Sequence, residues 1–280
     1  MARLLLILIL IVGPPPVLGA WDFIERYLAP RADLLPHWQT HDPAAAETID
    51  HSTWAEFLAA HVSRDRDGVN RVAYGNVSDA DRERLAAYIA RLTAVPIGRF
   101  SRAVQLAYWI NLYNALTVDL VLSVYPIDSI LDIDISPGIL AFGPWDAAMT
   151  QVEGRPLSLN DIEHRILRPI CRDARIHYAL NCASVGCPNL QPRPFTAANA
   201  EDLLDAYARE FINGPRGVRI DNGRLVVSKI YNWFADDFGG DDASIIGHLK
   251  VHARPQLAEA LGKIEKIHRY EYDWGLNGGP

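Results

Sequence analysis

Apolar residues recur at helical spacing in several segments of the chain, and polar caps or prolines mark their ends. A capping box opens the amphipathic run 78–92, and a similar cap precedes the run 158–167. The longest run, 101–124, is apolar on nearly all sides and stops before Pro126. These three segments are predicted to be helices, the longest of them buried.

The remaining elements follow from weaker patterns of the same kind. Further helices are expected at 21–29, at 53–62, at 197–211 and twice within 229–261. Strands are expected at 176–180, in a hairpin over 218–227 that turns at Asn-Gly, and at 264–274. Because helices outnumber strands and the strands come late, we predict an α+β fold, a single mainly helical domain with a small antiparallel sheet.

The first twenty residues have the layout of a secretory signal peptide. Arg3 precedes nine apolar residues from Leu4 to Val12, and small residues stand at Gly19 and Ala20. We therefore expect cleavage after Ala20 or Gly19, and a periplasmic or extracellular protein. The division expected is 1–20 as signal peptide, 21–52 as an N-terminal helix and polar linker, and 53–277 as the main domain.

No other segment is expected to cross a membrane. The apolar run of the signal is far shorter than the roughly 20 residues needed to span a bilayer. The next candidate, 103–125, is interrupted by Gln105, Asn111, Asn114 and Asp119. The mature chain is therefore predicted to have no membrane span.

Charge excludes one class of partner. The chain carries 27 basic and 34 acidic residues, a net charge of −7, and the two signs are interspersed. Because no basic face is apparent, nucleic acid is not an expected partner. An unknown small molecule or peptide is the partner that remains.

The segment IHYALNCASVGCPNL, residues 176–190, contains two of the three cysteines. In an oxidising compartment Cys182 and Cys187 could form a disulfide across four residues that include Gly186. Cys171 would then be a buried, inert thiol. In this interpretation the chain is a non-catalytic binding or scaffold module.

A second interpretation makes Cys182 a nucleophile. A cysteine acts as the thiolate, so it needs a base or a positive dipole that lowers its pKa. His177 is five residues away and would meet Cys182 only if the chain turns near Asn181, because odd separations change face on a strand. His164, on the preceding helix, is the other candidate base.

A third interpretation is a metal site. His164, His177, Cys182 and Cys187 are residue types that zinc prefers. Their spacing matches no standard zinc pattern, so no metal or other cofactor is expected.

Polar residues on apolar helix faces point to the same region. Glu163 shares a helix side with Leu159 and Ile166, so it needs a partner, and burial would raise its pKa. Asn111 and Asn114 project from one side of the long apolar helix and must also be satisfied. They either bind backbone groups or orient a catalytic histidine. We expect Glu163, His164, His177 and Cys182 to converge on one pocket.

Five sequence blocks together resemble the domain-of-unknown-function family 547. They occur in order over about residues 55–277: AYWINLYNAL (107–116), LSLNDIEHRILR (157–168), IHYALNCASVGCPNL (176–190), KIYNWFADDF (229–238) and YDWGLN (272–277). The family is found in bacteria, often on exported proteins, and in plants and animals, and carries no settled activity. The resemblance places its polar positions at Asn111, Asn114, Glu163, His164, His177, Cys182, Cys187 and Asp237. Since members also occur inside cells, an obligatory disulfide is disfavoured.

The leading hypothesis is therefore an exported thiol-dependent hydrolase or acyl transferase. Cys182 is the proposed nucleophile and His177 the proposed base. Asn114 or Glu163 would orient this base, and His164 is the alternative candidate for the base. The stretch 235–240 is interpreted as a helix end with a glycine cap.

Overall fold

The computed structural model describes residues 18–138 and 143–279, and within them helices dominate. The predicted α+β, mainly helical class is confirmed. Most of the predicted signal peptide, residues 1–17, lies outside the described part. The α-helices are α2 (Leu18–Leu28), α3 (Ser52–His61), α4 (Asp79–Thr93), α5 (Arg102–Val124), α6 (Arg168–Cys171), α7 (Ala200–Ile212), α8 (Ile230–Trp233), α9 (Asp242–His252) and α10 (Pro255–Leu261).

Shorter helical turns connect these elements. A π-helix, η5 (Asp161–Leu167), leads directly into α6. The 3-10 helices are η1 (Pro36–Gln39), η2 (Tyr74–Asn76), η3 (Ile97–Arg99), η4 (Ile130–Asp132), η6 (Ala174–Tyr178) and η7 (Ala235–Phe238).

Three small sheets complete the fold. Two are antiparallel pairs, β1 (Val62–Arg64) with β2 (Asn70–Val72) and β3 (Thr150–Val152) with β4 (Arg155–Leu157). The third has the order β5 (Val218–Asp221), β6 (Arg224–Ser228) and β7 (Ile267–Glu271). The predicted hairpin is β5–β6, whose Asn222 and Gly223 turn with positive φ of 49° and 76°. The predicted C-terminal strand is β7, which pairs with β6 in parallel.

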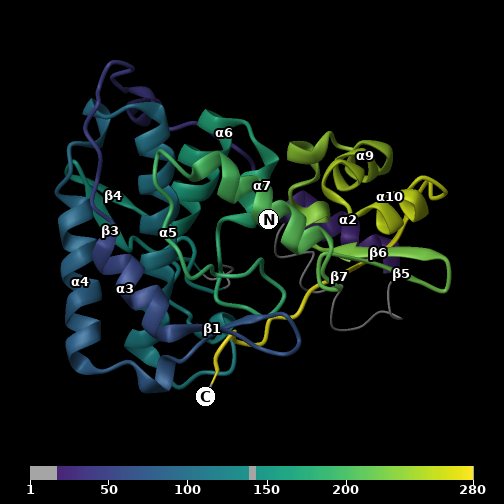
Figure 1. The fold of residues 1–280 in the computed structure, drawn as a ribbon, viewed down its shortest axis with the longest axis horizontal. Helices are drawn as coiled ribbons and strands as arrows, with labels where there is room; N and C mark the ends of the chain where they lie inside the picture. Colours follow the sequence, from purple (N-terminus) through teal and green to yellow (C-terminus); the bar gives the residue numbers. More distant parts are fainter. Residues whose placement is uncertain (1–17, 139–142, 280) are drawn as a thin grey trace.

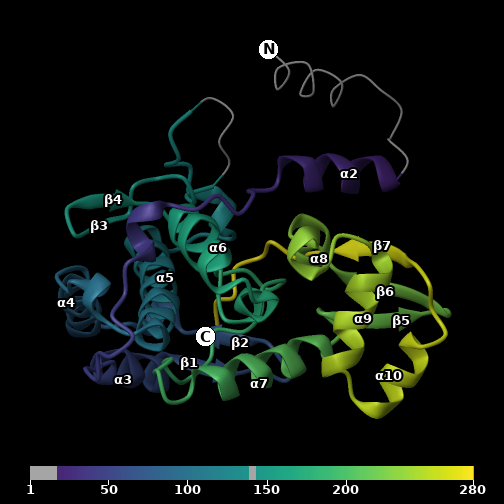
Figure 2. The same ribbon diagram turned by 90° about the horizontal axis from the view of Figure 1, so that it is seen from above.

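Helix α5 is the centre of the larger part of the molecule (Figure 1). Of its 23 residues 17 are buried, as expected for a helix that is apolar on nearly all sides. Helices α3 and α4 lie beside it, and the sheet β5–β6–β7 lies at the other end with α8, α9 and α10 (Figure 2). Helix α7 runs from one part to the other. No helix of the described residues combines the length and the apolar character that a membrane crossing requires.

The predicted strand at 176–180 is wrong. Residues Ala174–Tyr178 form the 3-10 helix η6, which Asp173 caps by accepting from the backbone N–H of Arg175. Ile176, His177 and Tyr178 are all buried, so no face is left for solvent, and no strand among the described residues pairs with this segment. Local hydrogen bonds satisfy this backbone instead.

The C-terminal segment after β7 returns to the larger part of the molecule (Figure 1). Isolated bridges pair Ser184 with Leu276, Ser129 with Gly275, and Val72 with Gly278. The segment therefore lies along the cysteine loop, 181–190, and places Tyr272 beside it.

Candidate functional site

The first group of functional side chains rests on the π-helix η5. Ser158 and Asp161 form a capping box, in which Ser158 Oγ accepts from Asp161 N at 3.0 Å and Asp161 Oδ2 accepts from Ser158 N at 2.9 Å. Glu163 and His164 follow, and both are buried. A π-helical turn often marks a functional position, because it changes which side chains face the interior.

His177 lies between two carboxylates. Its Nε2 is 2.7 Å from Asp237 Oδ2, and its Nδ1 is 3.4 Å from Glu163 Oε1. The ring of Phe234 stacks on the imidazole with centroids 4.3 Å apart. Burial alone would lower the pKa of His177, but the bonds to Asp237 and Glu163 raise it above its usual value. The expected contact between Glu163 and His177 is present.

Arg168 joins this group from the start of α6. Its Nε donates to Asp237 Oδ2 at 2.6 Å. Its Nη1 donates to Pro30 O at 2.8 Å and lies 3.0 Å from His164 Nδ1. Its guanidinium also lies 4.8 Å from the centre of the Phe234 ring. The carboxylate–histidine cluster is defined here as Glu163, His164, Arg168, His177 and Asp237.

The pKa values of the cluster members are shifted by burial and by their neighbours. Burial would raise the pKa of Glu163, but its interactions with His164, His177 and Arg168 lower it to about 2. The sign expected from burial alone is therefore wrong. Burial lowers the pKa of His164 to about 4, which keeps that ring neutral. Asp237 also has a lowered pKa, because bonds from His177 and Arg168 outweigh its burial.

The two asparagines of α5 bind backbone groups. Asn114 donates to Ala179 O at 2.9 Å and accepts from Asn181 N at 2.9 Å. Asn111 makes the same two kinds of bond with the backbone of Phe195. Asn114 therefore does not bond to a histidine; it fixes the backbone where the chain enters the cysteine loop.

Cys182 has different partners from those expected. Its Sγ is 3.1 Å from Ser184 Oγ and 3.0 Å from the Tyr272 hydroxyl, which are 2.8 Å from each other. Its backbone N–H donates to Cys187 Sγ at 3.0 Å. The expected Cys182–His177 bond is not formed, since both nitrogens of His177 are bonded to carboxylates. The thiol cluster is defined as Cys182, Ser184, Cys187 and Tyr272.

The pKa values of the three cysteines are shifted in different directions. Hydrogen bonds from Cys187, Ser184 and Tyr272 lower the pKa of Cys182 against the opposing effect of burial. Burial raises the pKa of Cys187 and raises that of Cys171 to about 12. All three are free thiols, so the alternative Cys182–Cys187 disulfide is not formed here. Cys182 is half-buried as a residue, whereas Cys187 is buried.

The two clusters are neighbours joined by aromatic rings. Phe234, which covers His177, lies 6.5 Å from Trp233, and Trp233 lies 4.8 Å from Tyr272. The charges of Glu163 and Cys182 both add to the effect of burial in raising the pKa of Tyr113. The convergence expected from the sequence is thus partial: Glu163, His164 and His177 share one cluster, and Cys182 belongs to the next.

The four residues of the metal interpretation are divided between these clusters. The described residues contain no group of three or more histidine, cysteine or acidic side chains arranged to hold a metal ion. The alternative zinc site of His164, His177, Cys182 and Cys187 therefore lacks the necessary geometry.

Sequence reasoning missed two partners of the site. Tyr272 lies in the segment expected as the C-terminal strand and Arg168 in the block LSLNDIEHRILR, but no local signal marks either side chain as a partner of the site. The family resemblance gives Asp237 as one of the polar positions, and the sequence pattern of 235–240 predicts a helix end. That interpretation also holds, because Gly239 ends η7 with a φ of 98°.

Residues 97–212 match a family model described as "Protein of unknown function, DUF547". The resemblance predicted from the sequence is confirmed over this segment, which includes α5, η5, the cysteine loop and α7. Asp237 and Tyr272 lie beyond the matched residues. No curated protein and no solved structure matches the chain. The family description assigns no activity, so any function must be argued from the clusters themselves.

Proposed function

We propose that the chain is a thiol-dependent hydrolase or acyl transferase in which Cys182 is the nucleophile. The observation that carries this proposal is the triangle of Cys182 Sγ, Ser184 Oγ and the Tyr272 hydroxyl, with sides of 3.1, 3.0 and 2.8 Å. Two hydroxyl groups that donate to sulfur stabilise the thiolate, which is the reactive form of cysteine.

The chemistry proposed is acyl transfer to sulfur. The Cys182 thiolate attacks the carbonyl carbon of an ester, a carbon–sulfur bond forms, and the alcohol oxygen leaves with its electron pair. Water or a second nucleophile then attacks the thioester and returns the thiolate. Ser184 and Tyr272 are the nearest groups to receive or supply the proton that these steps move.

His177 has a positioning role in this proposal, which replaces the role of base expected from the sequence. Its two ring nitrogens are already bonded to Glu163 and Asp237, so neither is free to take a proton from Cys182. Because η6 leads directly into the cysteine loop, the carboxylate–histidine cluster anchors one end of that loop. Asn114 anchors the next turn through Ala179 and Asn181.

An activated ester tests the proposal directly. We expect wild-type protein treated with p-nitrophenyl acetate to release p-nitrophenolate in a burst and to gain the mass of one acetyl group on Cys182. The leaving group has a low pKa, so the first step needs no protonation. Peptide mapping of the trapped protein locates the acetyl group.

Matched variants decide between this proposal and a non-catalytic module. Cys182→Ser is expected to lose the burst, while Cys171→Ser, which removes a thiol of raised pKa outside the thiol cluster, is expected to keep it. Equal, slow acetylation of lysines in wild type and Cys182→Ser would contradict the proposal and favour the binding or scaffold module.

We also propose that the chain acts after export. The support is the Arg3, apolar run and Gly19–Ala20 layout of the sequence. An exported form whose intact mass begins at Ala20 or Trp21 is the expected result, and a mass that includes Met1 would contradict it.

A further inference from the structure

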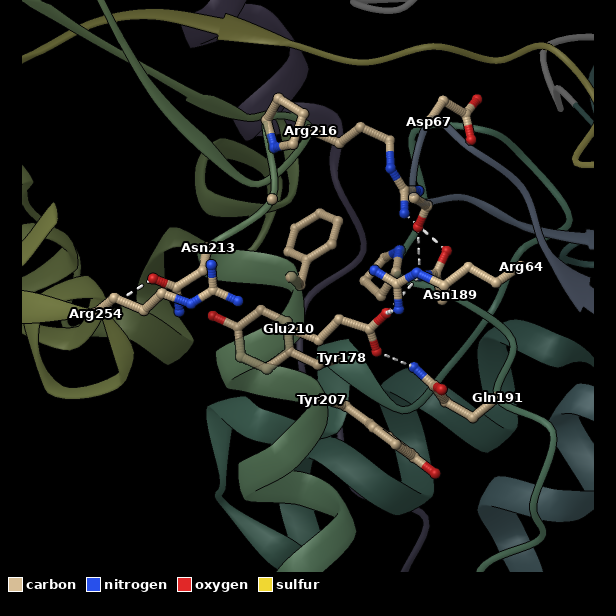
Figure 3. Close-up of a pocket in the computed structure, with 15 residues that line it drawn as sticks. Arg64, Asp67, Tyr178, Asn189, Gln191, Tyr207, Glu210, Asn213, Arg216 and Arg254 are labelled. Carbon is tan, nitrogen blue, oxygen red and sulfur yellow. Dashed lines mark hydrogen bonds and ion pairs between the residues drawn. The ribbon is translucent and has the colours of Figure 1, made fainter. Parts of the chain in front are cut away.

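One arginine beyond the residues of the family match binds the cysteine loop. Arg216 lies in the turn after α7, and its Nη1 donates to Val185 O at 2.5 Å and to Cys187 O at 2.6 Å. Its Nη2 donates to Asn189 Oδ1 at 2.7 Å. Figure 3 shows the Arg216 side chain extended toward Asn189, at the wall of a cavity of 250 Å³. A single guanidinium therefore joins three residues of the loop.

The C-terminal segment holds the same loop through its N–H groups. The backbone N–H of Val185 donates to Gly275 O at 2.7 Å. That of Gly186 donates to Asp273 O at 2.8 Å. A Cβ atom at Gly186 would lie 2.6 Å from Asp273 N, so the two backbones are in close contact. Because Arg216 binds carbonyl oxygens of the same turn, the loop is held through both kinds of backbone group.

The turn that carries Arg216 is itself fixed. The carbonyl of Gly214 accepts from the backbone N–H of Gly217 at 3.0 Å and from that of Val218 at 3.1 Å. A Cβ atom at Gly217 would lie 2.0 Å from Phe211 O, so the turn packs directly on the end of α7. The Arg216 guanidinium lies 5.9 Å from the centre of the Phe211 ring. Arg216 therefore reaches the cysteine loop from a defined position.

Cys187 connects the bond from Arg216 to Cys182. Its carbonyl accepts from Arg216, and its Sγ accepts from the backbone N–H of Cys182 at 3.0 Å. The hydrogen bond from the Cys187 side chain is also the largest of the effects that lower the pKa of Cys182. A displacement of Cys187 would therefore change the reactivity of the neighbouring thiol.

The carboxylates near Arg216 have other partners. Asp67 pairs with Arg71 at 2.6 Å. Glu210 pairs with Arg64, also at 2.6 Å. The charges of Asp67 and Glu210 still act on Arg216, as do those of Cys187 and Tyr272 in the thiol cluster. The three short bonds of Arg216 go to neutral oxygens of the loop, so its direct contacts are with the loop.

We propose that Arg216 is a positioning residue for Cys182. Its three hydrogen bonds hold the cysteine loop in the shape that places Cys182 Sγ beside Ser184 and Tyr272. The guanidinium suits this role because its donors are fixed in direction, whereas a lysine ammonium is a point charge on a flexible stem. Since Arg216 would serve the reaction of Cys182, this role rests on the proposed function.

Alkylation of Cys182 by iodoacetamide, followed against pH in the full chain, tests this role. Arg216→Lys keeps the positive charge but loses the planar set of donors, so we expect the pH midpoint of alkylation to rise by about 0.5 unit or more. Arg216→Gln, a second variant, loses both the charge and that geometry, and is expected to raise the midpoint at least as far. Circular dichroism identifies the variants that are folded.

Arg64→Lys is the matched control, because Arg64 is exposed and its described side-chain bond goes to Glu210 and not to the cysteine loop. It is expected to keep the wild-type midpoint. The role of Arg216 is overturned if its folded variants also keep that midpoint. It is equally overturned if Arg216→Gln raises the midpoint and Arg216→Lys does not, because charge alone would then be sufficient.

The ester assay separates this role from the proposed function. A wild-type protein that is alkylated at Cys182 but gains no acetyl group from p-nitrophenyl acetate would contradict the proposed function. A raised midpoint in Arg216→Lys would in that case still support the positioning of the thiol by Arg216. Acetylation of Cys182 with an unchanged midpoint in both Arg216 variants would support the proposed function and overturn the role of Arg216.

Discussion

Arg168→Ala is expected to lower the free energy of unfolding by about 3–5 kcal/mol, the loss typical of a buried ion pair that is deprived of one partner. The Arg168 side chain is 5% exposed and contacts Asp237, His164 and the carbonyl of Pro30. Its removal leaves the Asp237 carboxylate with His177 alone and breaks the bond to Pro30 O, one of the bonds that hold the segment before η1. Urea denaturation at pH 7 measures the change.

Arg165→Ala is the control for this prediction. Arg165 lies one turn earlier on the same helical segment, but its side chain is 41% exposed and pairs with Asp161 and Asp33 at the surface. Its loss is expected to cost no more than about 1 kcal/mol. Similar small losses in both variants would show that the cluster does not hold this region together.

A second large effect is expected from acid. Burial lowers the pKa values of His51, His164 and His248 to about 4 each. The unfolded chain binds these protons near the ordinary pKa of about 6.5. For a histidine with a lowered folded pKa, stability is present above the unfolded value and is lost as pH falls toward the folded one. We therefore expect a loss of several kcal/mol between about pH 6.5 and 4.

Two members of the carboxylate–histidine cluster, Glu163 and Asp237, extend this loss of stability to lower pH, and a third, His177, opposes part of it. Glu163 and Asp237 have lowered pKa values, so their contribution is present above about pH 4 and is lost below it. His177 has a raised pKa, so its contribution is present in acid and is lost as pH rises through its folded value. One such histidine cannot offset three of the other kind.

The pH dependence of the urea midpoint in wild type and in His51→Gln measures this effect. His51 bonds to the Tyr88 hydroxyl at 2.7 Å, far from both clusters in sequence, and glutamine can keep that bond. The variant is expected to show a shallower loss of stability between pH 6.5 and 4. An identical slope in both proteins would contradict the assignment of His51 as a buried neutral ring.

Local signals in the sequence predicted much of the fold. The capping box at Ser78, the apolar run that became α5 and the Asn222–Gly223 turn all depend on neighbours in the chain. The segment 176–180 was mispredicted because a short, largely apolar run such as IHYAL is typical of a strand. Its backbone is satisfied instead by local hydrogen bonds and by the cap at Asp173, while the His177 side chain binds Asp237, 60 positions away.

The sequence predicted the candidate site only where a charged side chain lies on an apolar helix side and therefore needs a partner. Glu163 on an apolar helix side needed a counter-charge, and His177 supplies it. The partners of Cys182 followed from no such rule. Tyr272 is 90 positions away and reaches the cysteine loop because Leu276 bridges to Ser184. The contact between Tyr272 and Cys182 depends on the path of the whole chain, which a local sequence pattern does not predict.

The pH dependence of Cys182 alkylation by iodoacetamide, followed by peptide mass in wild type and Tyr272→Phe, tests the central claim most directly. Phenylalanine keeps the ring that packs against Trp233 and Trp274 but removes the hydroxyl that is 3.0 Å from Cys182 Sγ. We expect wild-type Cys182 to react with a midpoint below the ordinary thiol pKa of about 8.5, and the variant to react with a higher midpoint. A wild-type midpoint at or above 8.5, a midpoint unchanged by Tyr272→Phe, or a thiol that reacts only after reductant is added would contradict the claim that this cluster activates Cys182.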